Sequence, residues 1–366
     1  MNNYMKSWHS TSLSALIVLS ITLLTLIVSC QTTQSYEDID PSLPNSYVAH
    51  YTKKAPQIDG KIDSLEWGSV KWSEAFGDIQ SDISPKYETK LKMIWDYDHL
   101  YILANLYDEH IWGNLKRRDT VIFYNNDFEV FIDHNGDTHN YAELEVNALN
   151  TVWDLLIDKP YLNGAKVDND WNIDGLVSNI HIEGTLNDFS DLDQFWTLEM
   201  AIPWKSLERM EFDGLAPEEK VWRMNFSRVQ WQFDTINGHY SRKKDSIGNF
   251  LKEDNWVWSK QIDINMHKPE YWGFVLFSKD STKTIYEVPK DFSMVKWMYE
   301  NFRKKSFKKL LEQGVYKTGI IGDHLIELNH VIIEGKRFLE FTSPISNIKY
   351  SVAEDGKLSM SGNKKD

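Results

Sequence analysis

The sequence predicts an all-β protein, an antiparallel β-sandwich with a small helical or α+β C-terminal extension. Between about residues 47 and 280, short runs of β-branched and aromatic residues are separated by turns rich in Asp, Asn and Gly. Several runs alternate apolar and polar side chains with a period of two, the pattern of a half-buried strand. A helical pattern occurs only from about residue 291 to residue 313. Many short strands with little helix are typical of two packed sheet layers.

The composition is that of an acidic globular chain with many aromatic residues. Its 366 residues include 40 Lys and Arg against 54 Asp and Glu, which gives a net charge of −14. Such a chain has no general attraction for phosphate backbones, so we expect no nucleic-acid partner. The single cysteine excludes an internal disulfide framework and a cysteine-based zinc site. The 15 Trp, 17 Tyr and 17 Phe are more than a core of this size normally uses.

Residues 1–29 are predicted to be a lipoprotein signal peptide. Lys6 and His9 precede an apolar run over residues 13–28, which is shorter than the roughly 20 apolar residues that span a bilayer. The run ends in Ile-Val-Ser-Cys, which resembles the bacterial lipobox, so Cys30 is the predicted lipidation site. The alternatives are a plain signal peptide and an anchor helix. We therefore expect a lipid anchor that attaches the chain to a membrane of the cell envelope.

The rest of the chain divides by composition. Residues 30–46 are polar, acidic and proline-bearing, so they are expected to form a tether. The predicted sandwich occupies residues 47–280, and the predicted helical or α+β extension occupies residues 281–355. Residues 356–366 are polar and are expected to be disordered.

Within the predicted sandwich, the strand-like runs can be placed one by one. Runs at 91–95 and 100–107 are split by a turn, as in a hairpin. The run at 127–133 places Phe128, Val130 and Ile132 on one face. The run at 141–147 alternates most cleanly, with Tyr141, Glu143, Glu145 and Asn147 on one face and apolar residues on the other. Further runs follow at 195–202, 221–233 and 272–277.

Five segments carry a resemblance to a known family. They are IDGKID at 58–63 with Glu66 and Trp67, Trp95-Asp96 with Leu100-Tyr101-Ile102, NDFEVFID at 126–133, EMAIPW at 199–204, and HKPEYWG at 267–273. In this order they resemble carbohydrate-binding module family 9. The resemblance implies a sugar-binding β-sandwich, with structural calcium in the members that are linked to xylanases. It is greatest to stand-alone lipoproteins with such a module, which favours the outer membrane as the location.

The sugar site of that family carries over only in part. In the xylanase-linked modules two tryptophans enclose the terminal sugar. The resemblance places Phe123 at the first of these positions, six residues before Glu129, which matches an acidic residue of the family. It places Met266 at the second position, and Glu145 where the family has an arginine. These departures imply a different sugar or a relocated aromatic platform.

The chemistry of sugar binding indicates further candidates. A pyranose presents an apolar C–H face that stacks on an aromatic ring, while its hydroxyls need hydrogen-bond partners. The polar face of 141–147 suits a sugar if loops do not cover it, and is otherwise a solvated sheet face. The tryptophans are candidates either for a platform on which a sugar ring stacks or for the hydrophobic core. The arginines are candidates either for donating paired hydrogen bonds to sugar hydroxyls or for neutralising nearby carboxylates. The predicted carbohydrate site is Trp112, Arg118, Phe123, Glu129, Glu143, Glu145, Asn147, Trp153, Trp171 and Arg228.

A short acidic loop is the predicted metal site. Asp133, Asn135 and Asp137 offer oxygen ligands on a tight turn, and the family resemblance implies structural calcium. Because Ca²⁺ takes 6–8 oxygens, this loop alone is not sufficient. The alternative is a solvated acidic turn.

The predicted function is non-catalytic binding of a poly- or oligosaccharide by a lipid-anchored protein that supports polysaccharide use. One alternative is a glycoside hydrolase, for which Glu129, Glu143 and Glu145 could supply a carboxylate pair, although no catalytic motif singles them out. A second alternative is a haem-binding sandwich, because relatives of this fold hold haem through His and Met. The available residues are His99, His110, Met93 and Met200.

Overall fold

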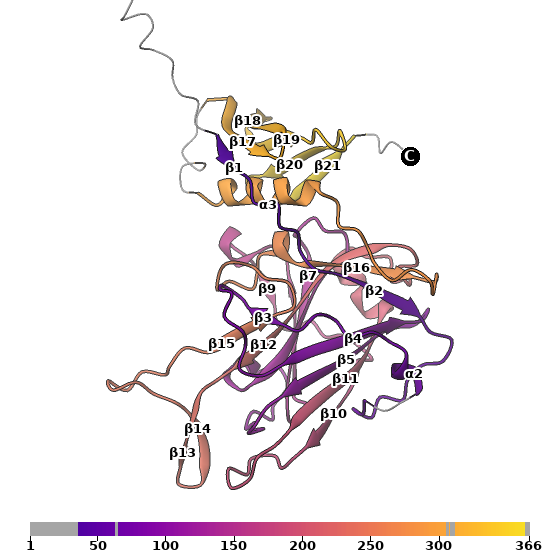
Figure 1. Ribbon diagram of the computed structural model, residues 1–366, viewed down its shortest axis with the longest axis vertical. Coiled ribbons are helices and arrows are strands. Elements are labelled where there is room, and N and C mark those ends of the chain that lie inside the picture. Colours follow the sequence, from indigo (N-terminus) through magenta and orange to yellow (C-terminus); the bar gives the residue numbers. More distant parts are fainter. Residues whose placement is uncertain (1–35, 63–64, 305–306, 308–311, 363–366) are drawn as a thin grey trace, which may run out of the picture.

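The computed structural model describes residues 36–362 except 63–64, 305–306 and 308–311. The predicted signal peptide and the predicted lipidation site Cys30 lie outside the described residues. Within the described part of the chain, none of the helices has the length and apolar character needed to cross a bilayer. Figure 1 shows a large β-sheet body and, at one end of it, a smaller unit that contains the C-terminal strands.

The large body is a β-sandwich, which confirms the fold class predicted from the sequence. Its strands are β2 (Ser46–Tyr51), β3 (Gly77–Asp78), β4 (Thr89–Trp95), β5 (His99–Tyr107), β6 (Asp127–Asp133), β7 (Tyr141–Asn147), β8 (Val152–Ile157), β9 (Val167–Asp168), β10 (Val177–Glu183), β11 (Phe195–Pro203), β12 (Val221–Gln230), β15 (Asp254–Val257) and β16 (Gly273–Ser278).

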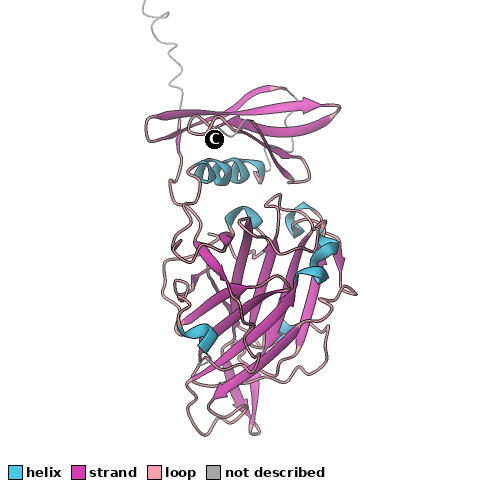
Figure 2. Ribbon diagram, turned by 90° about the vertical axis from the view of Figure 1, so that its right-hand side faces the viewer, coloured by secondary structure: helices cyan, strands magenta, loops and turns pink. Residues whose placement is uncertain are grey.

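These strands form one continuous curled sheet in the order β10-β11-β5-β4-β2-β16-β12-β6-β7-β8-β9, with β15 paired to β12 and β3 paired to β15. Neighbours are antiparallel, except that β2 runs parallel to both β16 and β4. β2 therefore joins two antiparallel halves, and Figure 2 shows their strands facing one another across the body.

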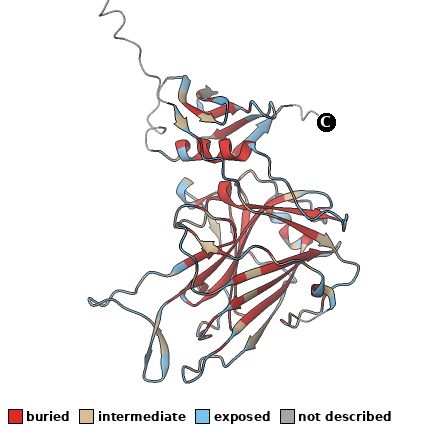
Figure 3. Ribbon diagram, viewed as in Figure 1, coloured by how far each residue is buried: buried red, intermediate tan, exposed pale blue. Residues whose placement is uncertain are grey.

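The core lies between the two halves because one side of each strand is apolar. From one half come residues such as Leu91, Met93 and Ile102, and from the other come Phe128 and Leu144, all of them in a single buried cluster. Figure 3 shows this buried interior running through the body. Since side chains alternate along a strand, the polar residues of β6 and β7 point to the opposite, outer side of the sheet.

Short helices and one hairpin complete the body. The hairpin of β13 (Phe233–Ile236) and β14 (His239–Arg242) projects from its lower end in Figure 1. The helices are α2 (Leu65–Gly68), η1 (Ile122–Tyr124), η2 (Tyr161–Asn163), η3 (Trp204–Met210) and η4 (Pro269–Tyr271).

The smaller unit is the predicted α+β extension. It combines α3 (Asp291–Phe302) with a sheet of β1 (Glu37–Asp38), β17 (Gly314–Ile321), β18 (His324–Ile333), β19 (Lys336–Thr342), β20 (Lys349–Ala353) and β21 (Leu358–Ser361), in that order. The face of α3 that carries Val295 and Met298 packs in a separate buried cluster with this sheet.

Two segments of this unit differ from what the sequence predicts. Glu37–Asp38, within the expected tether, pairs in parallel with β17, and the neighbouring Ile39 is buried. Leu358–Ser361, within the expected disordered tail, pairs with β20, and Leu358 is buried. Both segments are polar in composition, and main-chain pairing together with a buried apolar side chain, Ile39 or Leu358, holds each of them on the sheet.

The two units are joined by polar and aromatic contacts. Arg303, just after α3, donates from Nε and Nη2 to Glu270 Oε1 at 2.6 and 2.5 Å. The Arg223 guanidinium of β12 lies 4.1 Å from the ring centre of Phe274 and 4.7 Å from that of Phe292 on α3. The backbone N–H of Leu358 donates to the carbonyl of Asp137 at 3.0 Å.

Candidate functional site

The candidate site is a pocket of about 360 Å³ on the outer side of β6, β7 and β8. Its floor contains Glu129 of β6 with Glu143 and Glu145 of β7. The sheet register brings these side chains together, since Glu145 lies opposite Glu129 on one side and opposite Trp153 of β8 on the other. Five of the predicted carbohydrate-site residues therefore line one pocket: Phe123, Glu129, Glu143, Glu145 and Trp153.

Aromatic side chains form part of the pocket wall. Phe123 belongs to η1, and hydrogen bonds to both of its backbone groups fix its position. Its N–H donates to Glu145 Oε2 at 3.0 Å, and its carbonyl accepts from Trp231 Nε1 at 2.7 Å. Trp153 is half-buried, and Tyr161 of η2 is 44% exposed. The pocket thus offers partly exposed rings beside polar groups.

The segment that contains Met266 and His267 closes the pocket on a further side. The ring of Tyr161 stands perpendicular to that of His267, with ring centres 4.3 Å apart. His267 Nδ1 lies 2.9 Å from the hydroxyl of Tyr141, and Nε2 lies 3.8 Å from Glu143 Oε1. Burial lowers the pKa of His267 to about 3, so the imidazole is neutral at physiological pH.

The structure thereby places Met266 and Phe123 in the same pocket. These are the two positions at which the family resemblance implies the sugar-enclosing rings. Only Phe123 is aromatic. Trp153 and Tyr161 are further rings that line the pocket.

The carboxyl groups of the pocket floor lie in a strongly desolvated environment. Burial raises the pKa of Glu129 to about 8, and it holds the pKa of Glu143 and Glu145 well above the ordinary glutamate range. The neighbouring carboxyl groups raise these values further. Asp127, two residues before Glu129 on the same face of β6, is 0% exposed, and its pKa is raised by burial and then by Glu129.

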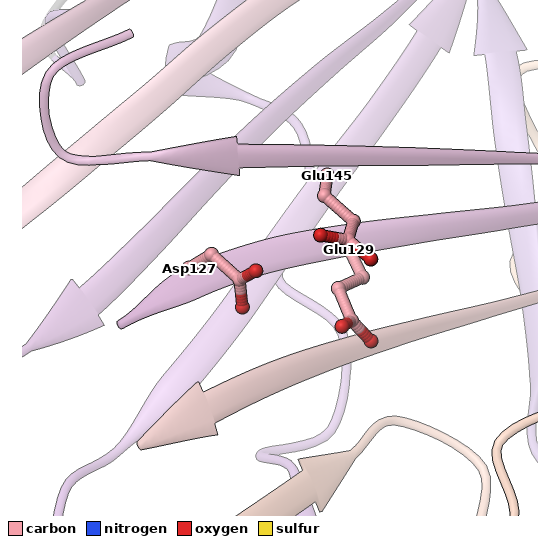
Figure 4. Close-up of side chains that lie close together, drawn as sticks. All are labelled: Asp127, Glu129 and Glu145. Atoms are coloured by element: carbon pink, nitrogen blue, oxygen red, sulfur yellow. The ribbon is translucent and has the colours of Figure 1, made fainter. Parts of the chain in front are cut away.

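One carboxylate oxygen from each of Asp127, Glu129 and Glu145 lies within 4.8 Å of the other two. Figure 4 shows the three side chains gathered on one face of the two neighbouring strands. Carboxylate oxygens in such a group are ligands that hard divalent cations prefer.

Two predicted platforms are not accessible. Trp112 and Trp171 are each 2% exposed: Trp112 packs with Val229 and Trp231, and Trp171 belongs to the sandwich core. Their polar sequence neighbours indicate surface loops, yet both rings turn inward. The expectation that these two rings are open to a sugar is therefore wrong.

The two predicted arginines have protein partners outside the pocket. Arg228 is fully buried and pairs with Asp108, with Nη2 2.9 Å from Oδ2. Arg118 donates from Nη2 to both oxygens of Asp154 at 2.5 and 2.7 Å, and from Nε to Asn172. Both therefore neutralise neighbouring carboxylates, the alternative role that the sequence analysis gives them.

Asn147 also has a structural role. Its Nδ2 donates to the carbonyl of Leu115 at 2.9 Å, and its Oδ1 accepts from the N–H groups of Leu149 and Thr151 at 3.0 Å each. The polar face of β7 is buried rather than solvated, because η1 and neighbouring loops surround it and leave Glu143 and Glu145 open only toward the pocket.

The acidic loop after β6 uses its oxygens within the protein. Asp133 accepts from the N–H groups of Gly136 at 2.9 Å and Thr138 at 2.8 Å, and Asp137 pairs with Lys357 at 3.0 Å. Asn135 donates to Asp137. The loop therefore serves as a contact for the C-terminal unit, and calcium binding there stays a prediction.

The residues named for haem occupy separate surroundings. Met93 and Met200 are completely buried in the sandwich core. His110 packs against Phe233 and Tyr240, with ring centres 5.4 and 6.4 Å away.

Sequence reasoning missed several contributors to the site, among them Asp127, Tyr161, Asn255 and Asn265. Asp127 shares the face of Glu129 by period-two alternation, so the pattern itself could have identified it. Tyr161 and Asn265 reach the pocket from loops. Nothing in the local sequence indicates where such loops fold.

Comparisons with known proteins found one family model and one curated relative that match part of the chain. Residues 58–215 match a family model described as carbohydrate family 9 binding domain-like. The chain is 28% identical over 175 residues to the exoglucanase XynX of Acetivibrio thermocellus, which covers 48% of this chain and 14% of that enzyme. The matched part is thus a small fraction of the relative.

Two solved structures are also similar to this chain. A family 9 carbohydrate-binding module from Caldicellulosiruptor kristjanssonii in complex with cellotriose is 17% identical, with a TM-score of 0.41 over 67% of this chain and 100% of that one. A putative carbohydrate-binding protein from Bacteroides uniformis is 14% identical, with a TM-score of 0.47 over 64% of this chain and 99% of that one.

Proposed function

Because residues 58–215 match a family model described as carbohydrate family 9 binding domain-like, we propose that this chain binds a poly- or oligosaccharide in the pocket beside β6, β7 and β8. Binding is non-catalytic and supports the use of the polysaccharide. One sugar ring stacks on Trp153 or Phe123, and its hydroxyls bond with the polar groups of the floor and rim.

The observation that supports this proposal most is that five predicted carbohydrate-site residues, from η1, β6, β7 and β8, line one pocket. The site combines partly exposed rings with carboxyl and amide groups such as Asn255 and Asn265. Burial raises the pKa of Glu143, so its carboxyl group keeps its proton and can donate a hydrogen bond to a sugar hydroxyl as well as accept one.

Hydrolysis receives less support from the same pocket. A glycosidase needs one ionised and one protonated carboxyl group, so the environments of the pair must push the two pKa values apart. Here burial raises the pKa of Glu129, Glu143 and Glu145 alike. The same preparation should therefore release no reducing ends from the polysaccharides that it binds.

The proposal includes a lipid anchor at Cys30 that holds the protein at the cell envelope, with the outer membrane as the favoured location. Its support is the basic and apolar start of the chain followed by the lipobox-like Ile-Val-Ser-Cys. Labelling with a radioactive fatty acid should modify the wild-type chain in a bacterial host, and Cys30→Ala should abolish the label.

The test of sugar binding is a glycan array of plant and algal polysaccharides, followed by isothermal titration with the best ligand. Trp153→Ala should weaken binding about tenfold, which corresponds to roughly 1.4 kcal/mol. Phe189→Ala, which removes an exposed ring outside the pocket, is the matched control and should bind like wild type. Equal affinity for the two variants would contradict the proposed site.

A further inference from the structure

The floor of the pocket brings three carboxylates together in a way that a sugar alone does not explain. Asp127 and Glu129 share one face of β6, and Glu145 lies directly opposite Glu129 on β7. One oxygen of each lies within 4.8 Å of the others, and the side chains are gathered on one face (Figure 4). Like charges directly opposite one another on neighbouring strands are destabilising.

These groups lack protein partners that would compensate their charge. In the described parts of the chain, no donor reaches full hydrogen-bond geometry at either oxygen of Asp127 or at Glu129 Oε2. The donors beside them, the Val229 N–H and the Ser227 hydroxyl, are neutral. Glu145 accepts the N–H of Phe123. The nearest base of the pocket, His267, contacts Glu143 and is neutral.

Two states of the three carboxyl groups would remove the repulsion between their charges. Burying an unpaired carboxylate costs several kcal/mol, so the groups must be protonated or neutralised by a bound cation. A shared proton joins at most two of the three groups, and Asp127 makes no hydrogen bond to either glutamate in this arrangement. A cation satisfies all three carboxylates at once.

We propose that Asp127, Glu129 and Glu145 bind a divalent cation, Ca²⁺ by the chemistry of the ligands, in the floor of this pocket. Ca²⁺ prefers oxygen ligands and takes 6–8 of them, and three carboxylates supply three to six. The site is separate from the loop of Asp133 and Asp137.

The remaining coordination positions face the pocket, because Glu129 and Glu145 both line it. Water, or neighbouring hydroxyls of a saccharide, completes the shell there. This last step rests on the proposed function, whereas the cation site itself does not.

The test uses the metal alone. EDTA-treated protein is titrated with CaCl₂ by calorimetry in the absence of sugar, and one site per chain is expected. Asp127→Asn should weaken Ca²⁺ binding at least tenfold, and Asp137→Asn, the matched control in the acidic loop, should change it less than twofold. No binding to wild type, or loss of binding in Asp137→Asn with Asp127→Asn unchanged, would overturn the proposal.

Thermal unfolding separates a cation site from a structural role. In EDTA, Asp127→Asn and Glu145→Gln should unfold at or above the wild-type temperature, because they remove buried like charges. Calcium should raise the unfolding temperature of wild type and of Asp137→Asn, but not of Asp127→Asn. A calcium-induced rise that persists in Asp127→Asn and Glu145→Gln would refute the site.

A saccharide titration with calcium or with EDTA distinguishes this inference from the proposed function. Weaker saccharide binding in EDTA would support coordination of sugar hydroxyls. One bound calcium with no saccharide binding would remove the proposed function and leave the cation site, and saccharide binding without any calcium site would remove the inference alone.

Discussion

Arg228 and Asp108 form an enclosed ion pair in which Nη2 lies 2.9 Å from Oδ2, with side chains 0% and 1% exposed. The guanidinium also donates to the carbonyl of Tyr107 at 2.7 Å and to Gln230 Oε1 at 2.9 Å. Burial lowers the pKa of Arg228 and raises that of Asp108, while their mutual attraction opposes both shifts. The pair therefore ties β12 to the end of β5, and its donors are used within the protein.

Replacing Arg228 by Met should consequently destabilise the fold. The change leaves Asp108 buried without its partner, which costs about 3–5 kcal/mol. Urea unfolding followed by tryptophan fluorescence measures this loss. Adding Asp108→Asn to Arg228→Met should restore part of the stability, and a loss below about 1 kcal/mol in the single variant would show that the pair is not structural.

Trp112→Ala should affect stability rather than sugar recognition. The ring is buried and stacks on Tyr240, with ring centres 5.9 Å apart and planes inclined by 18°. Removing a buried tryptophan costs about 3–5 kcal/mol. Thermal unfolding should show a clear loss for Trp112→Ala and a smaller one for the half-buried Trp153→Ala. The opposite order would mean that the Trp112 ring is open to solvent.

Arg303→Ala should loosen the contact between the two units. Arg303 donates two hydrogen bonds to Glu270, whose side chain is 0% exposed, so its loss removes the ion-pair partner of that buried carboxylate. We expect faster proteolytic separation of the two units. Arg337→Ala, which alters a solvent-exposed ion pair with Glu354, is the control and should be cleaved at the wild-type rate.

Glu37 makes the stability of the smaller unit depend on acid pH. Burial raises its pKa, but hydrogen bonds from Lys317 and Trp297 and the charge of Lys304 outweigh this effect and hold the pKa at about 2, against an ordinary value of 4.5. A depressed acid pKa stabilises the fold above the unfolded-state value, and this contribution is lost as the pH falls from about 4.5 toward 2.

Glu37→Gln should therefore lower the unfolding temperature at pH 7, and its difference from wild type should shrink as the pH falls through this window. Because Glu37 is 35% exposed, the stabilisation is modest, on the order of 1 kcal/mol or less. Asp323→Asn, in the turn between β17 and β18, serves as a control whose difference from wild type should stay small. If Glu37→Gln and wild type differed in unfolding temperature by the same amount at every pH, the lowered pKa of Glu37 would be contradicted.

The sandwich could be predicted from the sequence because its signals are local. Period-two alternation in residues 127–133 and 141–147 correctly placed the apolar face of each strand in the core. Alternation does not say what covers the other face. Glu143 and Glu145 are buried because segments distant in sequence fold over them.

The tryptophans show the same limit. Asn-Asp before Trp171 is typical of a surface loop, yet the chain turns back and inserts the ring into the core. The pairing of Glu37–Asp38 with β17 could not be predicted either, since about 280 residues separate the two strands and main-chain hydrogen bonds leave no trace in composition.

The parallel pairing of β1 with β17 also determines how the molecule bears mechanical load. A pull applied at Tyr36 acts along β1 and shears its few main-chain bonds to β17, among them the Ile39 N–H to Ile320 carbonyl bond of 2.8 Å. Tension on this end of the chain is thus taken up by the smaller unit. The segment between β1 and β2 bears that force only after β1 detaches.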